Sequence, residues 1–305
     1  MAFGALMVVW TLSLIPDLFD FFGSDGVAAV QTTNDWGVFA VWSSDEAVLI
    51  GWWMLLAAAI MLAIGWHSRV AALVIFVLIV SFERRTYFVF NAGDGLIRIE
   101  ALLLMLSACG AALSLDRRRA GQPFWSAESQ APWVVRLMQV QLSLIYLMSV
   151  LVKATGDTWQ QGTAVSYALR LDDMLILPVP QWLSNDALLM NVATWGTLAL
   201  ELAIGVLVWN RRLRAWVLGA GVVMHMLIML SINVGFFTPA MFVLYLAFVP
   251  PDRVSRFPHE LRRVVVAIRS RRRDGVSQLH TEEAVSNPTA ILRRSHGDHV
   301  HGVVA

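Results

Sequence analysis

The fold of this chain is organised around the stretch Ile145-Tyr-Leu-Met-Ser-Val-Leu-Val-Lys153-Ala-Thr-Gly-Asp-Thr-Trp159-Gln-Gln-Gly162-Thr-Ala-Val-Ser-Tyr167. An apolar run ends here in a polar segment with glycines, and Lys153 stands at the junction. It is the only lysine of the chain, since every other basic residue is an arginine. A lysine in a dry pocket can lose its proton and act as a base, whereas a lysine at a helix end can also simply reach the headgroups. Both readings stay open from the sequence.

The composition identifies an integral membrane protein. Hydrophobic residues make up 57% of the chain and charged residues only 15%, with a mean hydropathy of +0.63. These values are too apolar for a water-soluble domain, so the lipid bilayer is the expected partner. A formal net charge of +1 gives no reason to expect a nucleic-acid partner.

The apolar residues come in runs of about 20, the length of helix that crosses hydrocarbon. The sequence therefore predicts an all-α, polytopic helical bundle in the membrane. Its eight expected spans cover about 2–22, 46–66, 69–90, 95–115, 133–153, 187–209, 213–232 and 235–250.

The distribution of charge predicts the orientation. The loop 23–46 carries acidic residues and no Lys or Arg, while Arg69, Arg117 to Arg119 and Arg211 to Arg214 flank the alternate ends of the spans. By the positive-inside rule both termini are then cytoplasmic, and the loop 153–186 is external. We expect a multi-pass protein of the plasma or inner membrane.

Three regions follow along the chain. Residues 1–251 form the transmembrane helical domain, and residues 252–273 form a basic amphipathic segment at the cytoplasmic leaflet. Residues 274–305 have the composition of a disordered tail.

Ionisable side chains within the spans are functional candidates because they are costly in hydrocarbon. At the start of the fourth span, Asn91 and Asp94 lie in a glycine-containing turn, followed by Arg98 and Glu100. On a helix Asp94 and Arg98 are four residues apart, so we expect them to pair. Glu100 points to another face and needs a partner on a different helix. These four residues, with Trp159, are the predicted cofactor-binding residues.

Glu201 and His225 lie in the middle of the sixth and seventh spans. A mutual hydrogen bond, or pairing with Arg98 or Lys153, would satisfy them, and a histidine here is often only a contact between helices. With Lys153 they are the candidate catalytic residues. No metal site is expected, and no sequence motif indicates a zinc peptidase, an α/β-hydrolase, a P-loop NTPase or a Rossmann enzyme.

Together these motifs resemble the HTTM family, the transmembrane module related to vitamin K-dependent γ-carboxylases and to bacterial sporulation-delaying-type membrane proteins. The resemblance covers most of residues 1–251. It is carried by Arg84-Arg85 with Asn91-Ala-Gly-Asp94-Gly and Arg98, by Cys109-Gly110 before Leu113-Ser-Leu-Asp116, by Tyr146 with Lys153-x-x-Gly156-x-x-Trp159-x-x-Gly162, by Leu200-Glu201-Leu, and by His225 before Gly235-Phe-Phe.

The resemblance implies a chemical role for Lys153, because the carboxylases carry in this segment the lysine proposed to deprotonate reduced vitamin K. The chain also departs from their pattern. A second neighbouring lysine is absent, Cys109-Gly110-Ala-Ala stands where they have a histidine, and a short basic tail follows where they have a large extracytoplasmic domain. Peptide carboxylation is therefore not expected.

Three functions are in competition. In the first, an outer-half cavity lined by Lys153, Arg98, Glu100 and His225 binds a lipophilic small molecule, such as a reduced quinone of the vitamin K type, and acts on it by acid-base or redox chemistry. In the second, the chain is a non-enzymatic scaffold, an immunity component or a helper for a partner membrane or maturation protein. A transporter is the third, although no inverted repeat supports it.

Overall fold

The computed structural model describes residues 1–27, 37–107, 109–110, 114–121 and 131–250. The predicted amphipathic segment 252–273 and the predicted tail 274–305 lie outside these residues. In the described part the chain is all-helical, and the only β pairing there is an isolated bridge between Leu175 and Ile232. The helices are α1 (Ala2–Ser13), α2 (Leu18–Phe22), α3 (Val38–Val41), α4 (Asp45–Ile64), α5 (Ser68–Arg85), η1 (Tyr87–Val89), α6 (Ala92–Leu106), α7 (Leu115–Arg119), α8 (Trp133–Ala154), α9 (Asp157–Gln160), α10 (Ala164–Ala168), α11 (Gln181–Ser184), α12 (Ala187–Leu207), α13 (Arg214–Ser231) and α14 (Phe237–Leu246).

Each of the eight expected spans overlaps a helix of ten or more described residues, in the order α1, α4, α5, α6, α8, α12, α13 and α14. Four of them, α4, α8, α12 and α13, are long and apolar enough to cross a membrane by themselves. The helices α1 and α14 are apolar but shorter, with 12 and 10 residues. The described part of the chain is thus all-helical, and its long apolar helices indicate a membrane protein.

Helices α1 and α6 differ most from the expected spans. Helix α1 ends at Ser13, and the chain becomes helical again only at Leu18. Pro16 lies in this interval, and a proline disfavours helical geometry in the residue before it. Helix α6 begins at Ala92 and ends at Leu106, earlier at both ends than the span 95–115. Its start is fixed by Asn91, whose side chain caps the first turn.

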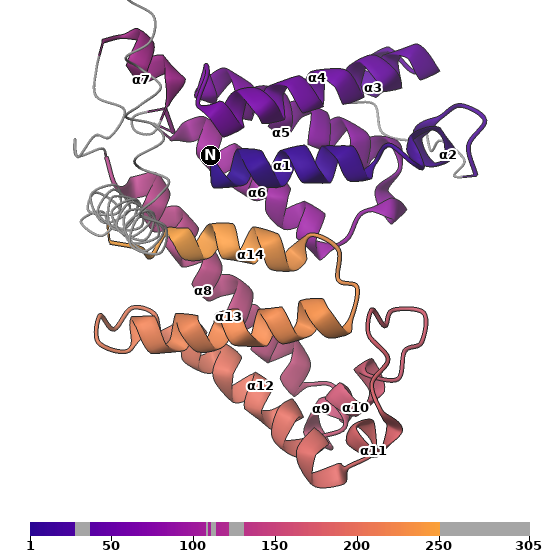
Figure 1. The fold of residues 1–305 in the computed structure, drawn as a ribbon, viewed down its shortest axis with the longest axis vertical. Helices are drawn as coiled ribbons and strands as arrows, with labels where there is room; N and C mark the ends of the chain where they lie inside the picture. Colours follow the sequence, from indigo (N-terminus) through magenta and orange to yellow (C-terminus); the bar gives the residue numbers. More distant parts are fainter. Residues whose placement is uncertain (28–36, 108, 111–113, 122–130, 251–305) are drawn as a thin grey trace, which may run out of the picture. The chain divides into compact units, whose positions relative to one another are not determined.

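The long helices pack in two groups, which are joined by α14 and by a direct contact of α6 with α8 (Figure 1). In the first group α1 packs against α4, α4 against α5, and α5 against α6. In the second group α8 packs against α12, and α12 against α13. Helix α14 contacts α1 and α6 of the first group and α8 and α13 of the second. The polar residues of the second group therefore meet at the place where α8, α12, α13 and α14 come together.

Large apolar side chains also point outward from the long helices. Trp53 on α4, Leu151 on α8 and Trp216 on α13 are 58%, 61% and 78% exposed. Helices that are apolar on the outside as well as the inside fit a lipid environment, because water would penalise that surface. These faces are the ones in contact with the bilayer.

The loops between the long helices gather at two ends. At one end, which we call the Lys153 end, Arg85 donates hydrogen bonds to the carbonyl oxygens of Phe22 and Ser43. The loop after Lys153 reaches the same end, since Ile176 N–H donates to the carbonyl oxygen of Ser231 at the end of α13 at 3.0 Å. The next helix, α14, starts against Gly93 at the start of α6. At the opposite end, Arg69 Nε donates to the carbonyl oxygen of Ser107 at 2.9 Å.

Candidate functional site

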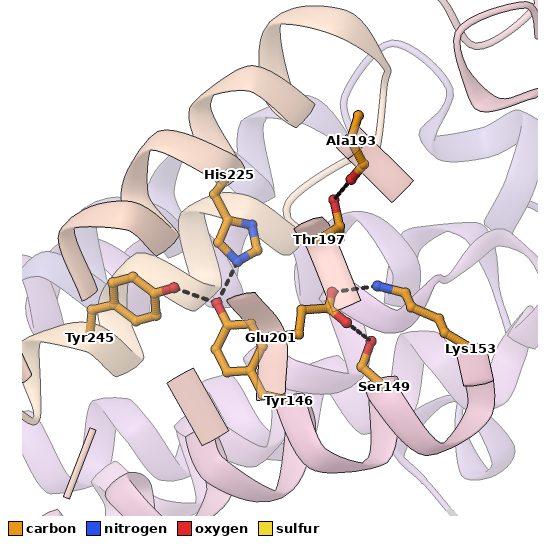
Figure 2. Close-up of polar contacts among 8 residues, drawn as sticks. All are labelled: Tyr146, Ser149, Lys153, Ala193, Thr197, Glu201, His225 and Tyr245. Carbon is orange, nitrogen blue, oxygen red and sulfur yellow. Dashed lines mark hydrogen bonds and ion pairs between the residues drawn. The ribbon is translucent and has the colours of Figure 1, made fainter. Parts of the chain in front are cut away.

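The site begins on one face of α8. Tyr146, Ser149 and Lys153 are three and four residues apart, so their side chains project from the same side of the helix, the side that faces α12 (Figure 2). On α12, Glu201 is 5% exposed. Its carboxylate forms an ion pair with Lys153 Nζ and accepts a hydrogen bond of 3.1 Å from Ser149 Oγ. Of the three partners that the sequence left open for Glu201, which are His225, Arg98 and Lys153, the structure gives Lys153.

Trp159 covers Lys153 from the loop side. The ammonium Nζ lies 4.8 Å from the centroid of the Trp159 ring, within the range of a cation–π contact. The backbone of Trp159 is held in turn, because Trp195 Nε1 on α12 donates to its carbonyl oxygen at 3.1 Å. The turn ends at Gly162 with a φ of 74°, and a Cβ there would lie 2.6 Å from Asn191 Oδ1. A glycine is thus required for the loop to fold back onto α12.

His225 on α13 forms the opposite side of the site. It is 2% exposed, and its Nε2 lies 2.8 Å from the hydroxyl of Tyr146. The Tyr146 hydroxyl also contacts the hydroxyl of Tyr245 on α14. The rings of Phe237 and Phe242 flank the imidazole, with centroids 5.8 Å and 6.1 Å away. Among the described residues, nothing forms a hydrogen bond with His225 Nδ1.

A cavity of about 970 Å³ lies between these groups. Its polar lining comes from Lys153, Trp159, Glu201 and His225, together with Tyr146, Ser149, Thr197 and Ser231, and most of the rest is aliphatic. A space of this size is large enough for a drug-sized molecule. The few polar groups would fix the orientation of a ligand, and the apolar walls would hold its hydrocarbon part.

The predicted residues of α6 lie outside the lining of this cavity. Asn91 and Asp94 form a capping box, in which Asp94 accepts from Asn91 N–H and the Asn91 side chain accepts from Gly93 N–H, each at 2.7 Å. Asp94 also accepts a hydrogen bond of 2.7 Å from Trp10 Nε1. Both residues therefore fix the start of α6 against α1.

The structure differs from the sequence predictions for the partners of Arg98 and Glu100. Arg98 forms its ion pair with Glu83 on α5, and not with Asp94. The reason is that Asp94 is already engaged by the cap and by Trp10, while Glu83 lies on the neighbouring helix. Glu100 is fully buried, and no hydrogen-bond partner for its carboxylate appears among the described residues. The partner on another helix that the sequence predicts for Glu100 is not found among the described residues.

The structure adds residues that the sequence analysis did not single out for the site. Ser149 was detectable, because it shares a helical face with Lys153. Tyr245 and Thr197 had no such signal, since their contribution depends on how α14 and α12 pack. In the described residues no group of three His, Cys, Asp or Glu side chains is placed to hold a metal ion.

Comparison with known proteins gives one match. A family model described as HTTM domain matches residues 32–253, more than half of the chain. This range contains α3 to α14 and every residue of the cavity. No curated protein and no solved structure matches the chain.

Proposed function

This chain belongs to the HTTM domain family, and on that premise we propose that it binds a lipophilic, quinone-like small molecule in the cavity between α8, α12 and α13. The observation that carries the proposal is the ion pair of Lys153 and Glu201 at the wall of a mostly apolar cavity. Two charges at the wall of such a cavity cost free energy. Their presence is best explained by a ligand whose polar head group binds to them.

The same pair supports acid-base chemistry on the ligand. Lys153 can give or take a proton, Glu201 holds it in place, and the apolar walls exclude water. In the ion pair Lys153 is protonated, so it acts as a base only after it passes one proton to Glu201. The neutral amine would then accept the proton of a ligand hydroxyl that approaches it. His225, with Tyr146, would hold the other side of the head. Lys153, Glu201 and His225 are the proposed catalytic residues, and Trp159 is a proposed binding residue.

The position of the cavity completes the proposal. The cavity lies toward the Lys153 end, because Trp159, Val165 and Ala168 from the loop after Lys153 line it. With both termini in the cytoplasm, the Lys153 end lies on the outer side of the plasma or inner membrane. The ligand would then bind in the outer half of the bilayer.

Residues of α6 play a supporting part in this proposal. Arg98, Glu100, Asn91 and Asp94 lie outside the cavity lining, so they would act on a ligand only through the packing of α6 against α14. Gly93 shows how close that packing is, since a Cβ there would lie 2.5 Å from Phe237 N.

The test is the identity of the molecule that stays with the protein. We would purify the wild type from its own membranes in mild detergent, extract it with organic solvent and analyse the extract by mass spectrometry. Lys153→Ala is the test variant. Leu151→Ala is its matched control, because Leu151 lies on the same helix, is exposed and does not line the cavity. We expect an oxygenated lipophilic molecule with the wild type and with Leu151→Ala, and less of it with Lys153→Ala.

One observation favours the scaffold function as an alternative. Lys153 already has two partners, Glu201 and Trp159, which is also what an anchoring cation would have. Lys153→Arg separates the two functions, because arginine keeps the charge and cannot act as a base. If the arginine variant keeps full activity in the cell and no extract contains a bound molecule, the scaffold is correct and the ligand proposal is wrong.

A further inference from the structure

The cavity lies between two membrane-crossing helices that diverge. Helices α12 and α13 are both long and apolar enough to cross a membrane. Near their connection they touch, since a Cβ at Gly221 on α13 would lie 2.9 Å from Cδ1 of Ile204 on α12. Toward the Lys153 end the two helices run apart (Figure 1). There Gly196 on α12 lines the cavity, and a Cβ at this position would meet no described atom within 4 Å. The space between the helices therefore widens toward the Lys153 end.

The wide part of this space is open on one side. Val192 on α12 and Val223 and Leu227 on α13 line the cavity, and they are 63%, 59% and 60% exposed. Side chains enclosed in a protein do not have such exposures, and Glu201 at the inner wall is only 5% exposed. Among the described residues the cavity is thus open between α12 and α13. We call this place, bordered by these two valines, Leu227 and Gly196, the lateral opening.

The lateral opening lies at the depth of the hydrocarbon. Gly196 is the tenth of 21 residues in α12, and Val223 is the tenth of 18 residues in α13. Both are therefore near the middle of a helix whose length matches the apolar core of a bilayer. The side chains at the border are aliphatic, as expected for a surface that meets lipid chains. Lipid, and not water, is consequently the medium outside the opening.

The Lys153 end of the cavity is covered by the protein itself. Val165 on α10 and Leu183 on α11 form part of the cavity wall at this end. The loop that follows α10 is held against the residues after α13, because Asn233 N–H donates to the carbonyl oxygen of Met174 at 2.8 Å. The described residues thus shield the cavity toward the outer water phase and leave it open toward the bilayer.

We infer that the ligand enters the cavity sideways from the bilayer through the lateral opening, and that its hydrocarbon chain stays in the opening while its head lies at Lys153 and Glu201. The ligand is then a membrane lipid with a polar head and a chain longer than the cavity. Gly196 sets the width that is available to this chain. The chain and head rest on the proposed function, whereas the opening concerns the protein alone.

The arrangement of polar and apolar groups agrees with this orientation. The side chains of Glu201 and Lys153 are 7% and 25% exposed, and so they lie deeper than the border of the opening. A head group at these charges leaves the chain on the side of the lipid, where hydrocarbon is favoured over water. A polar metabolite from the water phase would have to cross the bilayer to reach the same opening.

The opening can be tested without any ligand. The protein would be reconstituted with phosphatidylcholine that carries a diazirine at the end of one chain, and the labelled peptides would be identified by mass spectrometry after irradiation. We expect label on Met190 and Met224, which line the cavity and are 5% and 9% exposed. Leu188 and Trp216, which are exposed and lie outside the lining, should be labelled too. Gly196→Phe should lose the label of the two methionines and keep that of Leu188 and Trp216.

Gly219→Phe is the matched control. Gly219 is also an exposed glycine with no described atom within 4 Å of a Cβ, but it does not line the cavity. This variant should be labelled as the wild type is, and so should Gly196→Ala. Unlabelled Met190 and Met224 in the wild type would mean that another chain covers the opening, and would overturn the inference. The same loss with Gly219→Phe, or no loss with Gly196→Phe, would overturn the part played by Gly196.

The ligand half is tested with two quinones that have the same ring. One is tetramethyl-1,4-benzoquinone, and the other carries a decyl chain in place of one methyl group. In lipid nanodiscs we expect Gly196→Phe to weaken binding of the decyl compound about tenfold, the effect of about two methylene groups that lose their burial. Binding of the tetramethyl compound should change less than about twofold, because its ring does not occupy the opening. Gly219→Phe should bind both as the wild type does.

The two proposals fail in different ways. If the wild type binds neither quinone and the purified protein contains no other molecule, the proposed function is wrong and the ligand half falls with it, while the photolabelling still decides the opening. If Gly196→Phe weakens binding of both quinones equally, or of neither, the ligand half is wrong and the proposed function stands.

Discussion

Lys153 and Glu201 are 48 positions apart in the chain and form an ion pair between α8 and α12. The carboxylate is more deeply buried than the ammonium, with side-chain exposures of 7% and 25%. Removing the lysine would therefore leave the less accessible charge without its partner.

We predict that Lys153→Met destabilises the protein by about 1–3 kcal/mol, because the buried carboxylate of Glu201 keeps its hydrogen bond from Ser149 but loses its cation. The double variant Lys153→Met/Glu201→Leu should recover most of this loss, since no charge is left behind. Thermal unfolding in detergent measures both. If the double variant is destabilised by the sum of the losses of Lys153→Met and Glu201→Leu, the two residues are not coupled.

The ion pair of Arg98 and Glu83 gives a second prediction. A double-mutant cycle of Arg98→Met and Glu83→Gln should show a coupling free energy of about 0.5–3 kcal/mol. The matched cycle of Arg98→Met and Asp94→Asn should be additive within about 0.5 kcal/mol, because Asp94 binds Trp10 and the Asn91 backbone. Coupling only in the second cycle would restore the pairing expected from the sequence.

Gly221 and Gly219 form a matched pair on α13. A Cβ at Gly221 would meet Tyr245, whereas no atom lies within 4 Å of one at Gly219. Gly221→Ala should therefore destabilise the protein and shift the His225 ¹⁵N NMR signals, and Tyr245→Phe should shift them too, because either change removes the contact of the Tyr245 hydroxyl with Tyr146. Gly219→Ala should leave the signals unchanged and raise stability by up to about 1 kcal/mol through helix propensity. The same response from both glycines would mean that Tyr245 does not depend on this gap.

The orientation in the membrane is checked by labelling. A cysteine at Thr163, in the loop after Lys153, should react with an impermeant maleimide from outside the cell. The native Cys109 is replaced by serine for this test, although burial already raises the pKa of its thiol and lowers its reactivity. A reporter fused after Asn287 should read cytoplasmic. The reverse pattern would place the cavity in the inner half of the bilayer.

Much of the fold follows from local patterns in the sequence. Apolar runs of about 20 residues predict long helices because backbone groups in hydrocarbon must be paired within the segment. The residues 145–167 already placed Lys153 at the end of a helix with Trp159 in the next turn, and helical spacing places Tyr146 and Ser149 on the same face. The HTTM resemblance, which the family model confirms, was also readable from these motifs.

Only the tertiary structure decided which polar groups meet. The sequence left Glu201 with either His225, Arg98 or Lys153, and the packing of α8 against α12 selected Lys153. Helical spacing favoured Asp94 for Arg98, but Glu83 is closer once α5 lies beside α6. The contacts of His225 come from Tyr146 on α8, which is 79 positions away, and from rings of α14, the helix that follows α13. Hydrophobic periodicity describes one helix at a time, so it predicts the helix face on which a residue lies. The partner of that residue on another helix depends on how the two helices pack, which no local sequence pattern specifies.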